Sequence, residues 1–361
     1  MAKRLAVILG AGASFDSIRR SRTVGVSWSW RPPLTTELFE PKDESFSREV
    51  QEARRRNFET VLARYPRARS LASELGIRAA RGEGLEAVLR SWRDGEDYIV
   101  RRFQQVPFYI QDLLSEVGQN LLEPGTSADN YDVLVSRLLS SEFEQVAFIS
   151  LNYDLLLEKS LVTAGDTSNA VRTRLGLRWY TEASHKWLYV KLHGSVDWAQ
   201  RIISEKFAGN DTSHVMQELD ERPLIRDFNF GNVELLANPQ MRVVDGMICY
   251  PRLAIPVDDE YATVCPTPHL QAVSQFLKTC KNLLVIGARA KDNDLLELLG
   301  RAEMTCEGLG IVTGTPAGAD ETLGCVKEAV TLNTSTPLIS TNGFNQFIIT
   351  DELESFISSI S

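Results

Sequence analysis

Short apolar runs that end in glycine or polar side chains recur along the chain. The first run, Leu5 to Leu9, breaks sharply at Gly10, and a helical pattern begins near Ser14. The same layout recurs in residues 144–154, 187–198, 282–299 and 309–314. An apolar run of this length between glycine or polar residues is typical of a buried strand. Because these strands alternate with helical segments, the pattern predicts an α/β fold with a Rossmann-like parallel sheet and helices on both faces.

A long helical stretch separates the first strand from the second. Apolar residues recur at helical spacing from about Leu34 to Leu139, as in LEAVLRSW and FYIQDLLSEVGQNLL. Such a stretch is too long for a simple connection within a parallel sheet. We therefore expect one domain over residues 1–361, with residues 34–139 forming a helical insertion subdomain. We expect this subdomain to pack over the ligand-binding crevice of the sheet and to supply contacts between protomers.

The charge balance argues against a strong general affinity for nucleic acid. The 361 residues carry a net charge of −9, whereas phosphate backbones are held by Lys and Arg. One basic run stands out, but Glu52 and Glu59 are interleaved with it, so we interpret it as a solvated helix face. Its members are Arg54, Arg55, Arg56, Arg64, Arg67 and Arg69.

Neither a membrane segment nor a metal centre is predicted. No stretch approaches the roughly 20 continuous apolar residues of a membrane span, and the first residues lead directly into a strand, so we expect a cytoplasmic protein with no membrane partner. The five cysteines lie far apart without a CxxC pair, which excludes a zinc ribbon and indicates reduced, packed thiols. They are Cys249, Cys265, Cys280, Cys306 and Cys325.

The glycine turns at two strand ends are candidate nucleotide sites. In open parallel sheets, ligands bind outside the carboxyl ends of the strands, at a topological switch point. The turn at Gly10 to Gly12 opens a helix, so its backbone N–H groups are expected to point outward and to meet a pyrophosphate. A tight turn without a ligand is nearly as common. Gly287 makes a second turn of the same kind, and two such turns in one sheet favour a nucleotide.

Three polar residues at strand ends are candidates for chemistry. His193 follows an apolar strand, and Gly194 after it permits a sharp turn, which favours general acid or base work over a satisfied core histidine. The other three histidines are interpreted as surface or loop residues: His185, His214 and His269. Asn152 and Asp154 stand at the tip of another strand, where either would also serve as a helix cap. Both roles are compatible, because a cap at a strand end also faces the crevice.

The order and separation of three motifs resemble those of the sirtuin family. GAGAS at residues 10–14, SLNYD at 150–154 and KLHGS at 191–195 resemble the sirtuin motifs GAGxS, TQNxD and HG. The turn at Gly287 and the strand at Ile311 fit later nucleotide-contacting segments of that family. The resemblance covers roughly two thirds of the chain and leaves the helical insertion unmatched.

The resemblance implies an NAD-binding sheet and assigns roles by position. Asn152 would orient a water or the ribose, Asp154 would bind the nicotinamide carboxamide, and His193 would be the catalytic base. The dinucleotide would be contacted by Gly10, Ala11, Gly12, Ser14, Gly287 and Asp292. We do not expect Asn152 or His193 to fill space in the packed interior. Alanine variants of both are therefore expected to keep the fold and to lose most activity.

Departures from the family motifs direct the functional prediction. Protein-deacylating sirtuins carry a four-cysteine zinc module and a GTS turn, whereas this chain has no cysteine pair and reads GAR at residues 287–289. The chain is more similar to sirtuin-like domains of bacterial antiviral systems, which cleave NAD with water. The resemblance therefore implies an NAD+ hydrolase that releases nicotinamide and ADP-ribose as the toxic effector of an antiphage defence system. Two alternatives stay open: an NAD-dependent protein deacylase and a non-catalytic sensor of NAD or ADP-ribose.

The implied partners follow from the toxicity of such an enzyme. A toxic NAD hydrolase must be held inactive, so the resemblance implies a homo-oligomer or a partner such as a helicase-like ATPase or another component of the defence system.

Overall fold

The computed structural model describes twelve stretches of the chain: residues 3–17, 29–34, 37–39, 47–79, 85–93, 95–121, 129–164, 167–203, 211–221, 228–255, 264–333 and 336–360. These stretches form two compact units. The first, which we call the parallel-sheet unit, comprises Met1–Thr23, Leu122–His193 and Cys265–Ser361. The second, the mixed unit, comprises Val24–Leu121 and Gly194–Val264.

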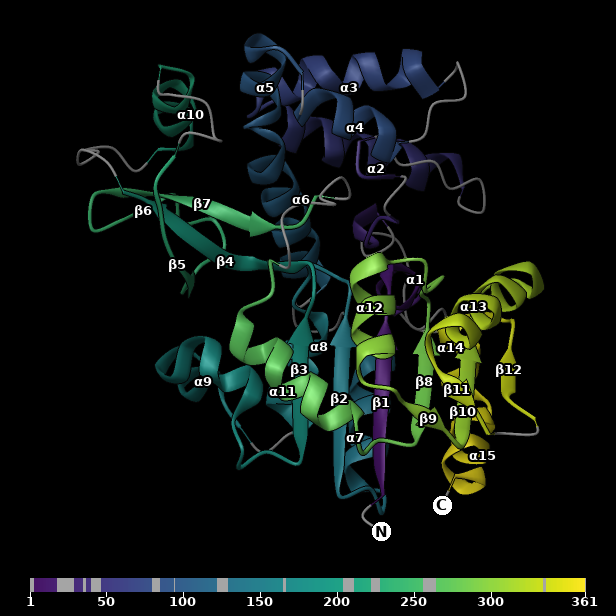
Figure 1. Cartoon of the computed structure of the whole chain (residues 1–361). Helices are drawn as coiled ribbons and strands as arrows, with labels where there is room; N and C mark the ends of the chain where they lie inside the picture. Colours follow the sequence, from purple (N-terminus) through teal and green to yellow (C-terminus); the bar gives the residue numbers. More distant parts are fainter. Residues whose placement is uncertain are drawn as a thin grey trace. The chain divides into compact units, whose positions relative to one another are not determined.

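A six-stranded sheet is the centre of the parallel-sheet unit (Figure 1). Its order is β12-β10-β8-β1-β2-β3, and every neighbouring pair is parallel. The strands are β1 (Arg4–Leu9), β2 (Gln145–Ser150), β3 (Trp187–Lys191), β8 (Asn282–Ile286), β10 (Gly308–Val312) and β12 (Leu338–Ser340). From β1 the chain adds β2 and β3 on one side, then β8, β10 and β12 on the other. The predicted α/β fold with a parallel sheet is confirmed.

Both faces of this sheet are buried. Alternate strand residues such as Ala6 and Ile8 join one core cluster, and the residues between them, such as Val7, are equally buried. This two-sided burial is the reason that the strands read as continuous apolar runs. One face packs against α11 (Thr267–Leu277), α12 (Asn293–Arg301) and α13 (Pro316–Ala329), and the other against α7 (Asp129–Ser140), α8 (Leu156–Ala164) and α14 (Gly343–Ile349).

The remaining elements of the parallel-sheet unit are short. They are α1 (Ala11–Phe15), α9 (Asn169–Leu175), the 3-10 helix η3 (Gly176–Thr181), α15 (Glu352–Ser359) and a two-stranded sheet of β9 (Thr305–Cys306) and β11 (Thr331–Leu332).

The mixed unit combines helices with a four-stranded antiparallel sheet. Its helices are α2 (Arg48–Leu62), α3 (Pro66–Ala79), α4 (Leu85–Arg93), α5 (Asp97–Phe103), α6 (Val106–Leu121) and α10 (Thr212–Glu221). Its strands are β4 (Gly194–Ile202), β5 (Phe230–Leu235), β6 (Val243–Val244) and β7 (Met247–Leu253), in the order β5-β4-β7-β6. No helix in the described stretches of either unit is long and apolar enough to cross a membrane.

This second sheet was not predicted. The sequence predicts one strand within residues 187–198, ending before His193, with a sharp turn at Gly194. β3 does end at Lys191, but a second strand, β4, begins at Gly194. Gly194 has φ +79°, and a Cβ there would lie 2.1 Å from the backbone oxygen of Arg252. Glycine is therefore required where β4 begins, as the sequence predicts for a sharp turn.

The helical pattern from Leu34 to Leu139 matches helices in the described residues, but those helices belong to two units. Residues up to Leu121 belong to the mixed unit, whereas α7 belongs to the parallel-sheet unit. That residues 34–139 act as one subdomain over a crevice therefore stays a prediction.

Buried charge pairs hold the helices of the mixed unit. Arg242 is bonded to Asp112 and, at 2.6 Å, to Oε1 of Gln111, whose amide nitrogen donates to the backbone oxygen of Val196. Arg54 is also buried, 3.4 Å from Glu37. The solvated-face interpretation is wrong for Arg54, because its guanidinium is buried and pairs with Glu37. It is right for the exposed Arg55, Arg56, Arg64 and Arg69.

Candidate active site

The polar strand ends meet at one edge of the parallel sheet. In the parallel register, Leu9 pairs with Ser150 and with Ile286, and Ser150 pairs with Lys191. The segments that begin at Gly10, Asn152, His193 and Gly287 therefore leave the sheet at the same edge. Strands β1 and β8 flank the topological switch point, which is where open parallel sheets bind ligands.

The two glycine turns pack directly against each other. Gly10 N donates to Ile286 O, and Gly12 N donates to Gly287 O, each at 3.0 Å. A Cβ on Gly10 would lie 2.6 Å from Gly287 O, and one on Gly287, where φ is +61°, would lie 2.1 Å from Ala13 N. Protein packing alone thus requires glycine at these positions. The expectation of outward N–H groups is wrong for Gly10, Gly12 and Ala13, because each donates to a protein carbonyl.

Four buried polar side chains form what we call the Ser14 cluster: Ser14, Tyr131, Asn152 and Asp154. The Ser14 hydroxyl donates to Asp154 Oδ2 at 2.6 Å and accepts from Asn152 Nδ2 at 2.9 Å. The hydroxyl of Tyr131 lies 3.0 Å from Ser14 Oγ. Burial, with the charge of Asp154 acting in the same direction, raises the pKa of Tyr131 above its usual range, so this hydroxyl stays protonated.

The cluster ties the first two strand ends together. Asn152 Nδ2 also donates to Gly10 O at 2.9 Å, which joins the end of β2 to the turn after β1. Asp154 Oδ1 accepts from Leu156 N, the first residue of α8, at 3.0 Å. It therefore bonds a free N–H group of the helix from the position before Leu155, whose carbonyl oxygen accepts the first helical hydrogen bond. Asn152 is only 7% exposed. The expectation that Asn152 lies outside the packed interior is therefore wrong.

A buried ion pair supports the loop that carries Asn152. Lys191 Nζ lies 2.9 Å from Glu158 Oε1 and also donates to the backbone oxygens of Tyr153 and Asp154. Glu158 accepts further hydrogen bonds from the hydroxyls of Tyr180 and Tyr189. A charge pair with this many partners meets the condition for stable burial. Sequence reasoning missed it, because a lysine at a strand end reads as solvated.

His193 faces an acidic partner that sequence reasoning did not assign to it. Its Nε2 lies 2.8 Å from Asp292 Oδ2, and its Nδ1 lies 3.2 Å from Leu151 O. Asp292 Oδ1 accepts from Leu295 N at 2.9 Å and caps α12. The two side chains are 20% and 24% exposed. The ring centroid of Tyr153 lies 6.2 Å from that of His193, so an aromatic ring and the imidazole are neighbours at this edge.

The pKa values of this pair move in opposite directions. Burial alone lowers the pKa of His193, but the hydrogen bond and charge of Asp292, helped by the charge of Asp294, raise it overall. Burial raises the pKa of Asp292, but the bond to His193 and the N–H of Leu295 lower it overall. Both shifts favour an imidazolium beside a carboxylate.

The other histidines differ in their surroundings. His214 is exposed, as predicted. The prediction is wrong for His269, which is 2% exposed in α11 and bonded through Nε2 to Leu177 O at 2.8 Å. Its burial lowers its pKa to about 4, so it is neutral at pH 7.

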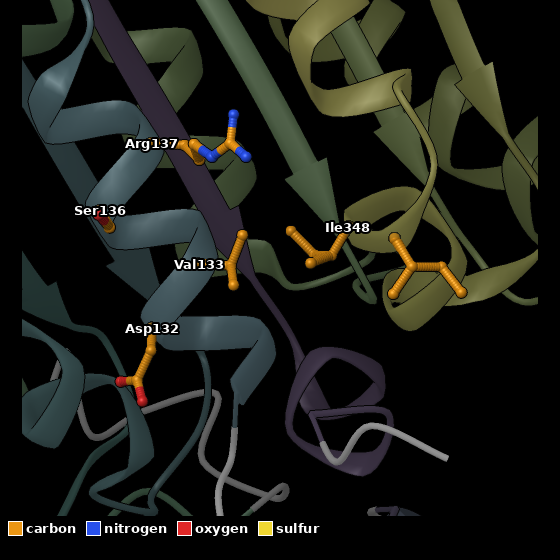
Figure 2. A pocket seen from close by; sticks show the side chains of 6 residues that line it. Asp132, Val133, Ser136, Arg137 and Ile348 are labelled. Carbon is orange, nitrogen blue, oxygen red and sulfur yellow. The ribbon is translucent and has the colours of Figure 1, made fainter. Parts of the chain in front are cut away.

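A surface pocket of about 460 Å³ lies elsewhere in the parallel-sheet unit, between α7 and α14 (Figure 2). It is lined by Asp132, Val133, Ser136, Arg137, Ile348 and Ile349. None of the predicted site residues lines it. Within the described stretches, no three metal-ligating side chains gather, and Cys249, Cys265, Cys280 and Cys306 are buried thiols, as the packing prediction requires.

Comparison with known proteins gives matches among solved structures alone. No family model and no curated protein matches the chain. One matching structure comes from work on the mechanism and regulation of Sir2 enzymes, with 14% identity, a TM-score of 0.44 and coverage of 100% of this chain and 94% of that one. Another is a Sir2 homologue in complex with NAD, at 12% identity and a TM-score of 0.38, covering 100% and 91%. Similarity at this level does not identify a reaction, so the chemistry rests on the residues above.

Proposed function

We propose that this protein is an NAD+ glycohydrolase that cleaves the nicotinamide–ribose bond with water. The observation that carries the proposal is the position of His193. A partly exposed imidazole follows the end of β3, bonds to the backbone of Leu151 beside Asn152, and shares the sheet edge with the two glycine turns. The order of the GAGAS, SLNYD and KLHGS motifs along the chain also supports the proposal of an NAD+ glycohydrolase.

The reaction needs positioning and a proton acceptor more than acid catalysis. The bond from the ribose C1′ to the nicotinamide nitrogen breaks, and its electron pair leaves with neutral nicotinamide. Water then forms the new bond to C1′ and loses a proton, which His193 accepts at Nε2. A general base of this kind contributes ~10²- to 10⁴-fold to the rate.

The other predicted residues are assigned supporting roles. The amide nitrogen of Asn152 is engaged by Gly10 and Ser14, so its carbonyl oxygen is the atom we assign to the water or the ribose hydroxyl. We propose that the dinucleotide is contacted by Gly10, Ala11, Gly12, Ser14, Asp154, Gly287 and Asp292. The Ser14 hydroxyl donates to Asp154 Oδ2, so these two side chains would meet the substrate through their remaining acceptor sites.

Incubation of the 361-residue protein with NAD+ tests the function. Free nicotinamide and ADP-ribose in equal amounts support hydrolysis. Acyl-ADP-ribose that forms only with an acylated peptide identifies a deacylase and contradicts the proposal. Calorimetric binding of NAD+ or ADP-ribose without turnover identifies a sensor.

The biological setting extends this proposal. We assign the enzyme to a bacterial defence system, as a cytoplasmic homo-oligomer controlled by a partner such as a helicase-like ATPase. Light scattering on the purified chain tests the oligomer, and the identity of neighbouring genes tests the partner.

A further inference from the structure

His193 is held between two hydrogen-bond acceptors. Leu151 O faces Nδ1 at 3.2 Å, and Asp292 Oδ2 faces Nε2 at 2.8 Å. A carbonyl oxygen only accepts hydrogen bonds, and so does an ionised carboxylate. A neutral imidazole carries a single N–H and can satisfy one of these two acceptors, whereas the imidazolium satisfies both.

The carboxylate of Asp292 is fixed from its other side. Its Oδ1 caps α12 through Leu295 N at 2.9 Å. An N–H donor at a helix N-terminus favours the charged form of a carboxyl group. The proton of the pair therefore belongs to His193, and the lowered pKa of Asp292 agrees with this assignment.

The other groups near the ring do not oppose this arrangement. Asp294, on the first turn of α12, adds negative charge that favours the imidazolium. Tyr153 presents an aromatic ring, which carries no charge. Lys191, two residues before His193, is paired with Glu158.

We infer that Asp292 is a positioning residue that holds His193 as the imidazolium, and that the ring must part from Asp292 before it can act as a base. This inference rests on the proposed function, in which His193 accepts a proton from water. An imidazolium bonded at both nitrogens has no lone pair for that proton. When the ring parts from Asp292, Nε2 releases its proton to solvent, and Nδ1 keeps its N–H on Leu151 O. The basic atom is then Nε2.

An NMR titration tests the pair without substrate. The 361-residue chain has four histidines, so ¹⁵N-labelled ring signals can be resolved. The signals of His193 are assigned by their loss in His193→Gln. We expect both ring nitrogens to be mostly protonated at a pH near 6.5, where an unperturbed ring is about half neutral. A neutral single tautomer at that pH in the wild type overturns the inference.

Charge variants on α12 sharpen this titration. Asp292→Asn keeps a capping side chain and is expected to move the midpoint of His193 down. Asp294→Asn removes the smaller charge effect of Asp294 on His193 and is expected to move the midpoint less. The exposed Glu297→Gln on the same helix is the matched control and should leave it unchanged. An unchanged midpoint in Asp292→Asn contradicts the inference, and if that variant does not fold, the wild-type spectrum still decides.

The pH profile of kcat/KM for NAD+ separates this role from a merely structural one. Between the wild-type midpoint and the lower midpoint of Asp292→Asn, the ratio of Asp292→Asn to wild-type kcat/KM should rise as pH falls, by at most about tenfold per pH unit for one proton, and it should level off below the midpoint of the variant. A structural defect lowers activity by the same factor at every pH, which contradicts the inference. If the NMR midpoints shift as expected but no NAD+ is consumed, the proposed function is wrong and the ion pair is still supported. If NAD+ is consumed but the midpoints do not shift, the ion pair is wrong and the proposed function is unaffected.

Discussion

The Ser14 cluster and the His193–Asp292 pair share one sheet edge but are built in opposite ways. In the cluster, Ser14 and Asn152 are 2% and 7% exposed, and the Ser14 hydroxyl and the Asn152 amide nitrogen are bonded to other protein atoms. In the pair, a fifth of the His193 side chain is exposed, and two acceptors face a ring whose neutral form has one N–H. A buried, satisfied network fixes the backbone, whereas a partly exposed titratable group can change its state. The contrast assigns structural support to the cluster, from which Asn152 also offers its carbonyl oxygen to the substrate, and proton transfer to the pair.

The largest effect on stability is expected where the two glycine turns touch. Gly287→Ala places a Cβ 2.1 Å from Ala13 N at φ +61°. The left-handed conformation alone costs about 1–2 kcal/mol, and the overlap adds to it, so we expect a severely destabilised or unfolded protein in urea titrations. Gly324→Ala in α13 is the matched control, since nothing lies within 4 Å of its Cβ, and it should gain about 0.5–1 kcal/mol. Wild-type stability in Gly287→Ala would show that the turns do not pack in this way.

Removal of the Asn152 side chain breaks the Ser14 cluster at its centre. Asn152→Ala leaves Gly10 O without this donor and also removes the hydrogen bond to Ser14. We expect a loss of about 1–3 kcal/mol in unfolding free energy, together with most of the hydrolysis. His193→Ala serves as the comparison and should unfold close to the wild-type temperature. Equal stability of Asn152→Ala and the wild type would remove the distinction between support and chemistry.

A smaller effect is expected for Tyr131, which reaches the cluster from α7. Tyr131→Phe keeps the buried ring but deletes the hydroxyl that lies 3.0 Å from Ser14 Oγ. Because Ser14 keeps its bonds to Asp154 and Asn152, we expect a loss of only about 1 kcal/mol. Tyr98→Phe, at a side chain that is 56% exposed, should change nothing. If both variants unfold alike, Tyr131 does not belong to the cluster.

The smallest effect concerns the pH dependence of stability. Because the pKa of His193 is raised in the folded state, His193 contributes stability that is fully present below pH ~6.5. This contribution is lost as pH rises through the folded-state pKa of His193. Because the pKa of Asp292 is lowered in the folded state, Asp292 contributes stability that is fully present above pH ~3.9. This contribution is lost as pH falls through the folded-state pKa of Asp292. The wild type should therefore exceed Asp292→Asn in stability most at mildly acidic pH and least at alkaline pH. Thermal unfolding of both proteins across pH measures this difference, and a constant gap would argue against the ion pair.

The sequence pattern predicts what is local in this fold and misses what depends on packing. The apolar runs locate β1, β2, β3, β8 and β10, because strands buried on both faces are apolar throughout. Their parallel order brings the strand-end residues to one edge, so Asn152 and His193 could be selected in advance. Tyr131 could not be selected in advance, because nothing in the local sequence of an amphipathic helix indicates which strand end a tyrosine on it contacts.

Long-range partners explain the other misses. Asp292 is a helix cap by its local pattern, and only the fold brings it to His193, 99 residues away in sequence. Lys191 and His269 lie in the interior, where Glu158 pairs with Lys191 and Leu177 O bonds to His269, and neither partner can be predicted from the local sequence. The antiparallel sheet of the mixed unit escaped prediction because its first strand begins only two residues after β3, so its first residues resemble the glycine and polar end of the β3 run.

NAD+ turnover by the wild type and by His193→Ala tests the central claim most directly. The two proteins are compared at equal concentration, with melting temperatures as the control on folding. The wild type should release nicotinamide and ADP-ribose, and His193→Ala should be slower by ~10²- to 10⁴-fold at an unchanged melting temperature. The double variant with Asn152→Ala should lose little more activity, because both residues serve one step. Turnover near the wild-type rate in a folded His193→Ala protein would contradict the assignment of His193 as the base.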